Sequence, residues 1–192
     1  SPTLTDFALL TGSGLHYRGG SGVLESPRPR YEVPNPLRHA TGLDANESSV
    51  PGVPLPALED GWSLRPVQDD SDVSVVHRWM NTEHVAVNWQ QAWPWSQWRD
   101  ELVGQRAGDR SLPCLVSKDG QEIAYLELYR VARDGLARTY PYHPHDLGVH
   151  IAIGEPAATG RGFGTALLKA VARGLLAADP AFALVAVLLF PS

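Results

Sequence analysis

The stretch that decides the fold is Asp146–Leu176, which reads DLGVHIAIGEPAATGRGFGTALLKAVARGLL. Its first part, Leu147–Ile153, is a short apolar run with β-branched residues, which predicts a β-strand. Gly162-Phe163-Gly164-Thr165 then opens a segment with apolar residues at helical spacing. A strand, a glycine-rich turn and a helix are therefore expected in succession.

The glycine-rich turn is typical of an anion site, because the first amides of a helix are unpaired and the helix dipole is positive there. Glycines at 160, 162 and 164 let the backbone approach a pyrophosphate closely. A P-loop is excluded because no Gly-Lys-Ser/Thr follows, and the glycine spacing is not that of a dinucleotide-binding Rossmann turn. The alternative is a glycine turn with a purely structural role.

Composition narrows the class of protein. The 192 residues are enough for one domain with a sizeable core and an extension. The net charge is −5 and the basic residues are scattered, so we expect neither a nucleic acid nor a membrane as partner. The single cysteine, Cys114, fits a reducing cytosol and lies in an apolar run, where we expect it to be packed rather than nucleophilic.

Residues 1–60 and residues 61–192 differ in proline content and in the periodicity of their apolar residues. Residues 1–60 hold half of the prolines and lack sustained periodicity, which predicts an irregular Pro/Gly-rich N-terminal extension. Residues 61–192 are expected to form the globular domain. Asp69, Asp70 or Ser71 would cap its first helix and Ser96 its second, and Asp119-Gly120 would turn a hairpin. The expected order is a strand at 62–67, helices at 71–80 and 96–105, strands at 111–117, 123–129 and 147–153, a helix at 163–176 and a strand at 182–189.

Five blocks of this domain occur in a familiar order. They are Trp79-Met80-Asn81, Trp93-Pro94-Trp95-Ser96-Gln97-Trp98-Arg99, Tyr125-Leu126-Glu127-Leu128-Tyr129, Asp146-Leu147-Gly148-Val149-His150 and Arg161-Gly162-Phe163-Gly164. The series resembles the siderophore-biosynthesis branch of the GNAT acyltransferase superfamily, which includes mycobactin lysine N-acyltransferases and N-hydroxylysine acetyltransferases. The resemblance covers about residues 61–190, and Thr159 stands where the GNAT loop pattern has Gln or Arg.

The resemblance implies an α/β (α+β) fold, with a GNAT-like mixed, mostly antiparallel sheet flanked by helices. A GNAT domain continues with a further helix and one or two strands, so we expect this domain to be C-terminally short and to lack those strands. The implied donor is acetyl-CoA, a longer acyl-CoA or an acyl carrier protein. The implied acceptor is the side-chain nitrogen of lysine or N-hydroxylysine, in cytoplasmic hydroxamate siderophore biosynthesis for iron acquisition.

Catalytic roles follow from the same resemblance and from acid–base chemistry. A lysine amine has a reference pKa of about 10.4, so a base must take its proton, and imidazole titrates near neutral pH. His150 matches the family's catalytic histidine; the alternative is a half-buried strand histidine bonded to a carbonyl. The family's oxyanion-binding backbone falls at Ile151, Ala152 and Ile153. The family also places a catalytic Asp after the last expected strand, and residues 188–192 contain none.

Binding residues are expected at both ends of the site. The acyl-CoA phosphates would contact Gly160, Arg161, Gly162, Phe163, Gly164 and Thr165. The acceptor would contact Trp79, Asn81 and Glu127, although tryptophans at helical spacing are often core residues and alternation equally allows Glu127 to face solvent. His143 and His145 have a ligand-like spacing, but no third ligand accompanies them and we expect no metal.

Two other functions stay open at this point. The fold is shared with aminoglycoside and other small-amine N-acetyltransferases, whose acceptor choice lies in variable loops. A catalytically inactive GNAT remnant that binds acyl-CoA is the third interpretation.

Overall fold

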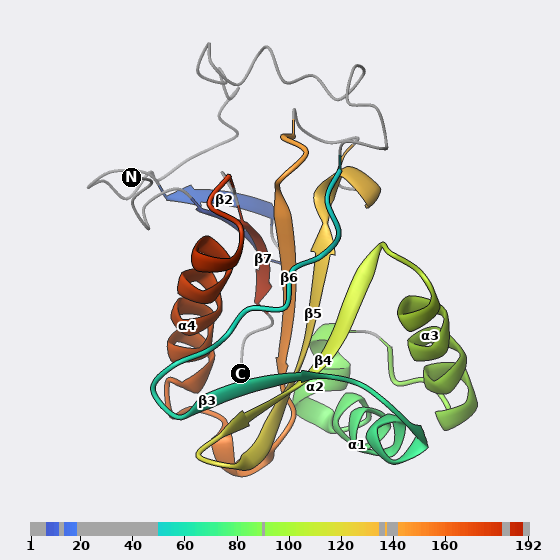
Figure 1. Ribbon diagram of the computed structural model, residues 1–192. Coiled ribbons are helices and arrows are strands. Elements are labelled where there is room, and N and C mark those ends of the chain that lie inside the picture. The colour runs from blue at the N-terminus through green and yellow to red at the C-terminus, as the bar shows by residue number, and fades with distance from the viewer. Residues whose placement is uncertain are drawn as a thin grey trace.

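The computed structural model describes residues 7–11, 14–18, 50–89, 91–134, 137, 142–181 and 185–189. Its central feature is a seven-stranded sheet with the order β2-β1-β7-β6-β5-β4-β3 (Figure 1). The strands are β1 (Phe7–Thr11), β2 (Gly14–Arg18), β3 (Trp62–Pro66), β4 (Ser111–Lys118), β5 (Gln121–Arg130), β6 (Leu147–Ile153) and β7 (Val185–Leu189).

The strand directions confirm a mixed, mostly antiparallel sheet. Strands β3, β4, β5 and β6 pair antiparallel in succession, whereas β7 is parallel to both β6 and β1. The β4–β5 hairpin turns at Asp119 and Gly120, whose φ angles are 50° and 82°. Two successive positive φ values are what a two-residue hairpin turn requires, as the Asp-Gly pair predicts.

In the described part of the chain, four α-helices cover the two faces of the sheet. They are α1 (Asp70–Met80), α2 (Glu83–Trp89), α3 (Trp95–Ala107) and α4 (Phe163–Ala178). Figure 1 shows α4 on one side of the sheet and α1, α2 and α3 on the other. None of the helices in the described part of the chain is both long and apolar enough to cross a bilayer.

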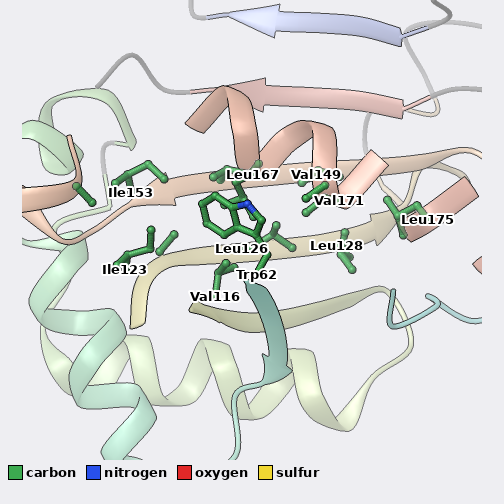
Figure 2. Packing of buried hydrophobic residues seen from close by; sticks show 14 of the residues in the cluster. Trp62, Val116, Ile123, Leu126, Leu128, Val149, Ile153, Leu167, Val171 and Leu175 are labelled. Atoms are coloured by element: carbon green, nitrogen blue, oxygen red, sulfur yellow. The ribbon is translucent and has the colours of Figure 1, made fainter. Parts of the chain in front are cut away.

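Both faces of β5 and β6 are buried, which explains their nearly continuous apolar sequences. Toward α4, alternate residues of the two strands pack on Leu167, Val171 and Leu175; this face carries Leu126, Leu128, Val149 and Ile151 (Figure 2). Toward α1 and α3, the intervening residues Tyr125 and Ala152 pack on a second apolar cluster. Successive side chains of a strand point to opposite faces, so each strand contributes to both cores.

Three features differ from the expectations. The extension is not irregular throughout, because β1 and β2 form a hairpin that pairs with β7 through backbone hydrogen bonds. The short helix α2 was not expected, since its seven residues are too few for a clear helical period. The second expected helix starts earlier: Pro94 occupies the N-cap with no side-chain bond, and Ser96 lies inside the first turn.

A buried arginine joins three parts of the domain. The guanidinium of Arg130 donates to the backbone oxygens of Gly52 at 2.8 Å and His145 at 2.7 Å, and it pairs with Asp179 at 2.9 Å. Asp179 also accepts from His145 Nδ1 at 2.9 Å and stands at the C-cap of α4. Burial alone would raise the pKa of Asp179, but the bonds from His145 and Arg130 outweigh it and hold the pKa below its usual range.

Replacing Asp179 by Asn should destabilise the domain, because the Arg130 charge, only 1% exposed, would lose its counter-ion. Removing one partner of a buried pair costs about 3 kcal/mol or more. The folded pKa of Asp179 is depressed, so its contribution is present above the unfolded pKa of about 3.9 and is lost as the pH falls below that value. Urea unfolding between pH 7 and pH 3 should show a smaller acid-induced loss of stability in Asp179→Asn.

The matched control is Asp119→Asn, since Asp119 is 72% exposed and Asn tolerates its positive φ. Equal stabilities of the Asp179→Asn variant and this control at pH 7 would contradict a structural role for the buried pair.

Candidate functional site

His150 lies on β6 directly opposite Glu127 of β5, on the face that carries α1, α2 and α3. Its Nδ1 is 3.5 Å from Glu127 Oε2, and the two side chains are 24% and 16% exposed. The pair is thus partly shielded from water while remaining reachable. The Glu127 side chain is mostly buried, so the alternative prediction that it faces solvent is wrong.

Two aromatic rings flank the imidazole. The Tyr129 ring is tilted against His150 with centroids 4.7 Å apart, and the Trp89 ring approaches at 5.9 Å, nearly perpendicular. Tyr129 has room for this position because residue 148 is glycine: a Cβ there would lie 2.0 Å from Tyr129 Cζ. Burial raises the pKa of Tyr129 well above its usual value, so the phenol stays neutral.

Glu127 is held by a side chain of α3. Gln105 Nε2 donates to Glu127 Oε1 at 3.2 Å and to Glu101 Oε1 at 2.9 Å, and Gln105 Oε1 accepts from Tyr125 Oη at 3.4 Å. Burial raises the pKa of Tyr125, which keeps that hydroxyl protonated as a donor. Gln105 therefore orients the carboxylate that faces His150.

A cleft of about 550 Å³ adjoins this carboxylate. It lies along α3 and the start of β4, and both Glu127 and Tyr129 line it. Its lining contains charged groups of both signs, with four carboxylates and two guanidinium groups: Asp100, Glu101, Glu127, Asp134, Arg110 and Arg133. A small polar molecule that enters this cleft reaches the Glu127 end of the pair with His150.

The C-terminal end of β6 extends past the described part of its pairing with β7. The described β6–β7 register ends at Ile151 and Leu189. Gly154 N donates to Ile123 O at 2.9 Å, and antiparallel alternation then directs the Ile153 amide toward the β7 side. Ala152 lies opposite Tyr125 within the ladder, so its amide faces β5. The Ile153 carbonyl accepts from His84 Nε2 of α2 at 2.9 Å.

The glycine-rich turn connects this end of β6 to α4. Gly160 and Gly162 have φ angles of 68° and 74°, and Gly162 is the N-cap of α4 without a side-chain cap bond. An added Cβ at either glycine would meet nothing within 4 Å. A Cβ at Gly164 would lie 4.0 Å from Ile153 Cγ1, so the helix start adjoins the strand end. The turn is open enough for a phosphate group to approach the first amides of the helix.

The side chain of Arg161 extends this surface. It is exposed, and its guanidinium carbon lies 5.2 Å from the centre of the Phe163 ring. Phe163 in turn meets Trp62 edge-on at 6.0 Å. Stacking on an aromatic ring orients the arginine without neutralising its charge.

Several expected binding residues have other roles. Trp79 is 1% exposed and packs under Gly154, where a Cβ would lie 2.1 Å from its ring, so it belongs to the core rather than to a pocket wall. Asn81 caps α1 and donates to Trp93 O at 3.1 Å, which joins the helix to the following loop. His145, which has a ligand-like spacing from His143, bonds to Asp179, and the described residues contain no cluster of three His, Cys, Asp or Glu side chains that could hold a metal ion.

Three residues of the site were not singled out from sequence: His84, Gln105 and Tyr129. Only Tyr129 could have been predicted from the sequence, because it follows Glu127 by two positions and therefore lies on the same face of the strand. The others come from helices whose positions against the sheet depend on tertiary packing.

Comparison with known proteins identifies relatives. Residues 68–187 match the family model described as an acetyltransferase (GNAT) domain. The chain is 37% identical over 143 residues to the lysine N-acyltransferase MbtK of Mycobacterium sp. (strain MCS), covering 74% of this chain and 59% of that protein. It is 35% identical over 153 residues to the protein of the same name from Mycobacterium tuberculosis (strain H37Rv), covering 80% and 68%.

A third relative is more distant: the N(6)-hydroxylysine O-acetyltransferase of Escherichia coli, 27% identical over 125 residues, covering 65% of this chain and 40% of that protein. The chain spans about three-fifths of the length of the Mycobacterium sp. protein, as the covered share of 59% shows.

Solved structures show the same fold. An uncharacterized protein from Bacillus halodurans superposes with a TM-score of 0.61 at 28% identity, covering 68% of each chain. The aminoglycoside acetyltransferase AAC(6')-Ib in complex with coenzyme A gives 0.52 at 20% identity, covering 62% of this chain and 69% of that one. The second likeness shows the fold alone.

Replacing Gly148 by Ala should destabilise the domain by about 1–3 kcal/mol, because the new methyl overlaps the Tyr129 ring and the buried site is overpacked. The matched control is Gly104→Ala in α3, where a Cβ meets nothing within 4 Å and stability should rise by up to about 1 kcal/mol. Urea denaturation of both variants measures the two effects. A Gly148→Ala variant as stable as wild type would show that Tyr129 does not need this glycine.

Proposed function

The chain belongs to the acetyltransferase (GNAT) domain family, and from this premise we propose that it transfers an acyl group from acyl-CoA to the side-chain nitrogen of lysine or N-hydroxylysine in hydroxamate siderophore biosynthesis. The observation that carries the proposal is the His150–Glu127 pair, because His150 lies on the strand whose end adjoins the glycine-rich turn. The similarity to lysine N-acyltransferases supports the choice of acceptor.

In this proposal His150 is the general base. The acceptor amine must be neutral to attack, and an imidazole held beside a carboxylate can take its proton and carry the resulting charge. Glu127, 3.5 Å from Nδ1, would stabilise the imidazolium and keep Nε2 directed toward the acceptor. The amine nitrogen forms a bond to the thioester carbon, the carbon–sulfur bond breaks, and the donor leaves as a thiol.

The backbone of β6 would stabilise the negative charge that develops on the thioester oxygen. Of the three residues expected from sequence, Ile151 lies within the β7 ladder and Ala152 faces β5. The proposal therefore rests on the Ile153 amide, which is directed toward the β7 side past the described pairing. One preorganised donor of this kind is worth about 10²–10³ in rate.

The donor diphosphate would lie on the start of α4. The open space at Gly160 and Gly162 and the N-cap without a side-chain bond fit a phosphate there. The amides of Phe163, Gly164 and Thr165 would contact it, with Arg161 as the adjoining positive charge. When bound, coenzyme A supplies the activated acyl group as a thioester. An acyl carrier protein is the alternative donor, and a cytoplasmic setting is part of the same proposal.

The proposal is tested by thiol release from acetyl-CoA and longer acyl-CoA donors with lysine and with N-hydroxylysine. We expect release with at least one acceptor, and a fall in kcat of about 10²–10⁴ in His150→Gln, the range for loss of a general base. His77→Gln in α1 is the matched control and should retain the wild-type rate.

Other outcomes would contradict the proposal. Release only with an aminoglycoside would indicate the small-amine alternative. Binding of coenzyme A, seen as a thermal shift, without release to any acceptor would indicate an inactive relative. An unchanged rate in His150→Gln would remove His150 as the base.

Arg161→Ala should raise the KM for acyl-CoA about three- to fivefold with little change in kcat, as loss of one exposed ion pair worth up to about 1 kcal/mol allows. The matched control is Arg173→Ala, an exposed arginine farther along α4 whose side chain is 59% exposed. Initial rates at varied acyl-CoA concentration measure both. Equal KM values for the two variants would show that Arg161 does not contact the donor.

A further inference from the structure

The cleft beside Glu127 carries opposite charges along its length. Glu127, Glu101 and Asp100 line it together with Arg110 and Arg133. A purely cationic acceptor such as a diamine would use only the carboxylates. The presence of guanidinium groups in the same cleft indicates an acceptor that also carries a negative charge.

The two arginines differ in their partners. Arg133 is paired with Asp109 at 3.1 Å and donates to Val50 O at 3.0 Å, so its charge is used within the protein. Arg110 donates through Nε to Arg133 O at 3.2 Å, and within the described ranges no carboxylate forms an ion pair with it. Its terminal nitrogens are therefore the available cationic donors in the lining of the cleft.

The strand register sets the spacing between the two charges. Ser111 lies opposite Tyr129 and Pro113 opposite Glu127, so Arg110 is three strand positions beyond Glu127. This corresponds to about 10 Å of strand. Both residues line the same cleft. Arg110 precedes the first residue of β4, so strand alternation does not set the direction of its side chain, and its Nε bond to the backbone oxygen of Arg133, another residue of the lining, holds the guanidinium beside this cleft. An amine and a carboxylate separated by four methylene groups and Cα, as in lysine, match such an arrangement.

We propose that Arg110 binds the α-carboxylate of the acceptor while its side-chain amine lies at Glu127 and His150, so that the cleft selects amino-acid acceptors over diamines of the same length. The proposal rests on the proposed function and adds the residue that determines acceptor specificity. A guanidinium can bind a carboxylate through two parallel N–H bonds, which favours arginine here over lysine. Gln105 and Glu101 complete the opposite end, where the amine enters.

The test compares an amino-acid acceptor with its decarboxylated counterpart: lysine with cadaverine, or N-hydroxylysine with N-hydroxycadaverine. Thiol release is measured for wild type, Arg110→Ala and the control Arg106→Ala, an exposed arginine of α3 that does not line the cleft. In Arg110→Ala we expect the KM for the amino acid to rise about tenfold, as for one lost charge-assisted bond, with kcat nearly unchanged. The KM for the diamine should not change, and Arg106→Ala should match wild type.

A rise in KM for both acceptors alike, or for neither, would overturn the proposal, since only contact with the carboxylate separates them. A second variant, Arg110→Gln, keeps an N–H donor toward Arg133 O and so tests whether a folding defect explains the result of Arg110→Ala. It should also raise the KM for the amino acid without changing the KM for the diamine.

Failure of the proposed function is distinguishable from failure of this inference. If none of the acceptors supports thiol release by wild type, titration calorimetry without donor can still measure how tightly the cleft binds lysine and cadaverine. Tighter binding of lysine by wild type than by Arg110→Ala would uphold the carboxylate site without transfer. Equal binding, or none by wild type, would overturn it.

Discussion

The pairing of β5 with β6 is the constraint on which the rest of the molecule depends. Both strands are buried on both faces, so a slip of one residue would move apolar side chains from each core to the wrong side. The register that satisfies both cores places Glu127 opposite His150. The candidate catalytic pair is thus a consequence of packing: its geometry is set by the burial of Leu126, Leu128, Val149 and Ile151 on the opposite face.

Arg130, on β5, fixes three segments that lie outside the sheet relative to this strand pair. Its bonds join the backbone at residues 51–52, the loop before β6 and the C-cap of α4. A charge this deeply buried is tolerated because each of the three guanidinium nitrogens donates to at least one oxygen. Since α4 is a single continuous helix, fixing its C-terminal end also fixes where its glycine-rich start meets the end of β6.

The two substrates of the proposed reaction would approach from different elements. The open helix start of α4 offers backbone amides and positive potential, which suit a diphosphate. The cleft along α3 offers carboxylates and an arginine, which suit a zwitterionic acceptor. His150 lies in the middle of β6 and the Ile153 amide at its end, so this one strand connects the two environments. In this arrangement, different elements bind the large anionic donor and the small acceptor. Residues that bind one substrate can therefore be replaced without altering the shared strand β6.

Local pattern was sufficient for the features that depend on neighbouring residues. The strand–turn–helix of Asp146–Leu176 and the Asp119-Gly120 hairpin were readable because alternation, turn chemistry and helical spacing act over a few positions. The candidate base His150 came instead from the resemblance to the acyltransferase family together with acid–base chemistry. Features that depend on distant partners were not readable. The pairing of β1 with β7 joins residues from opposite ends of the chain, and the burial of Trp79 under Gly154 depends on how α1 meets β6. The contact of Gln105 with Glu127, the bond of His84 to Ile153 and the cleft that contains Arg110 likewise arise only when helices dock on a sheet, because no local period encodes which side chain of one element meets which of another.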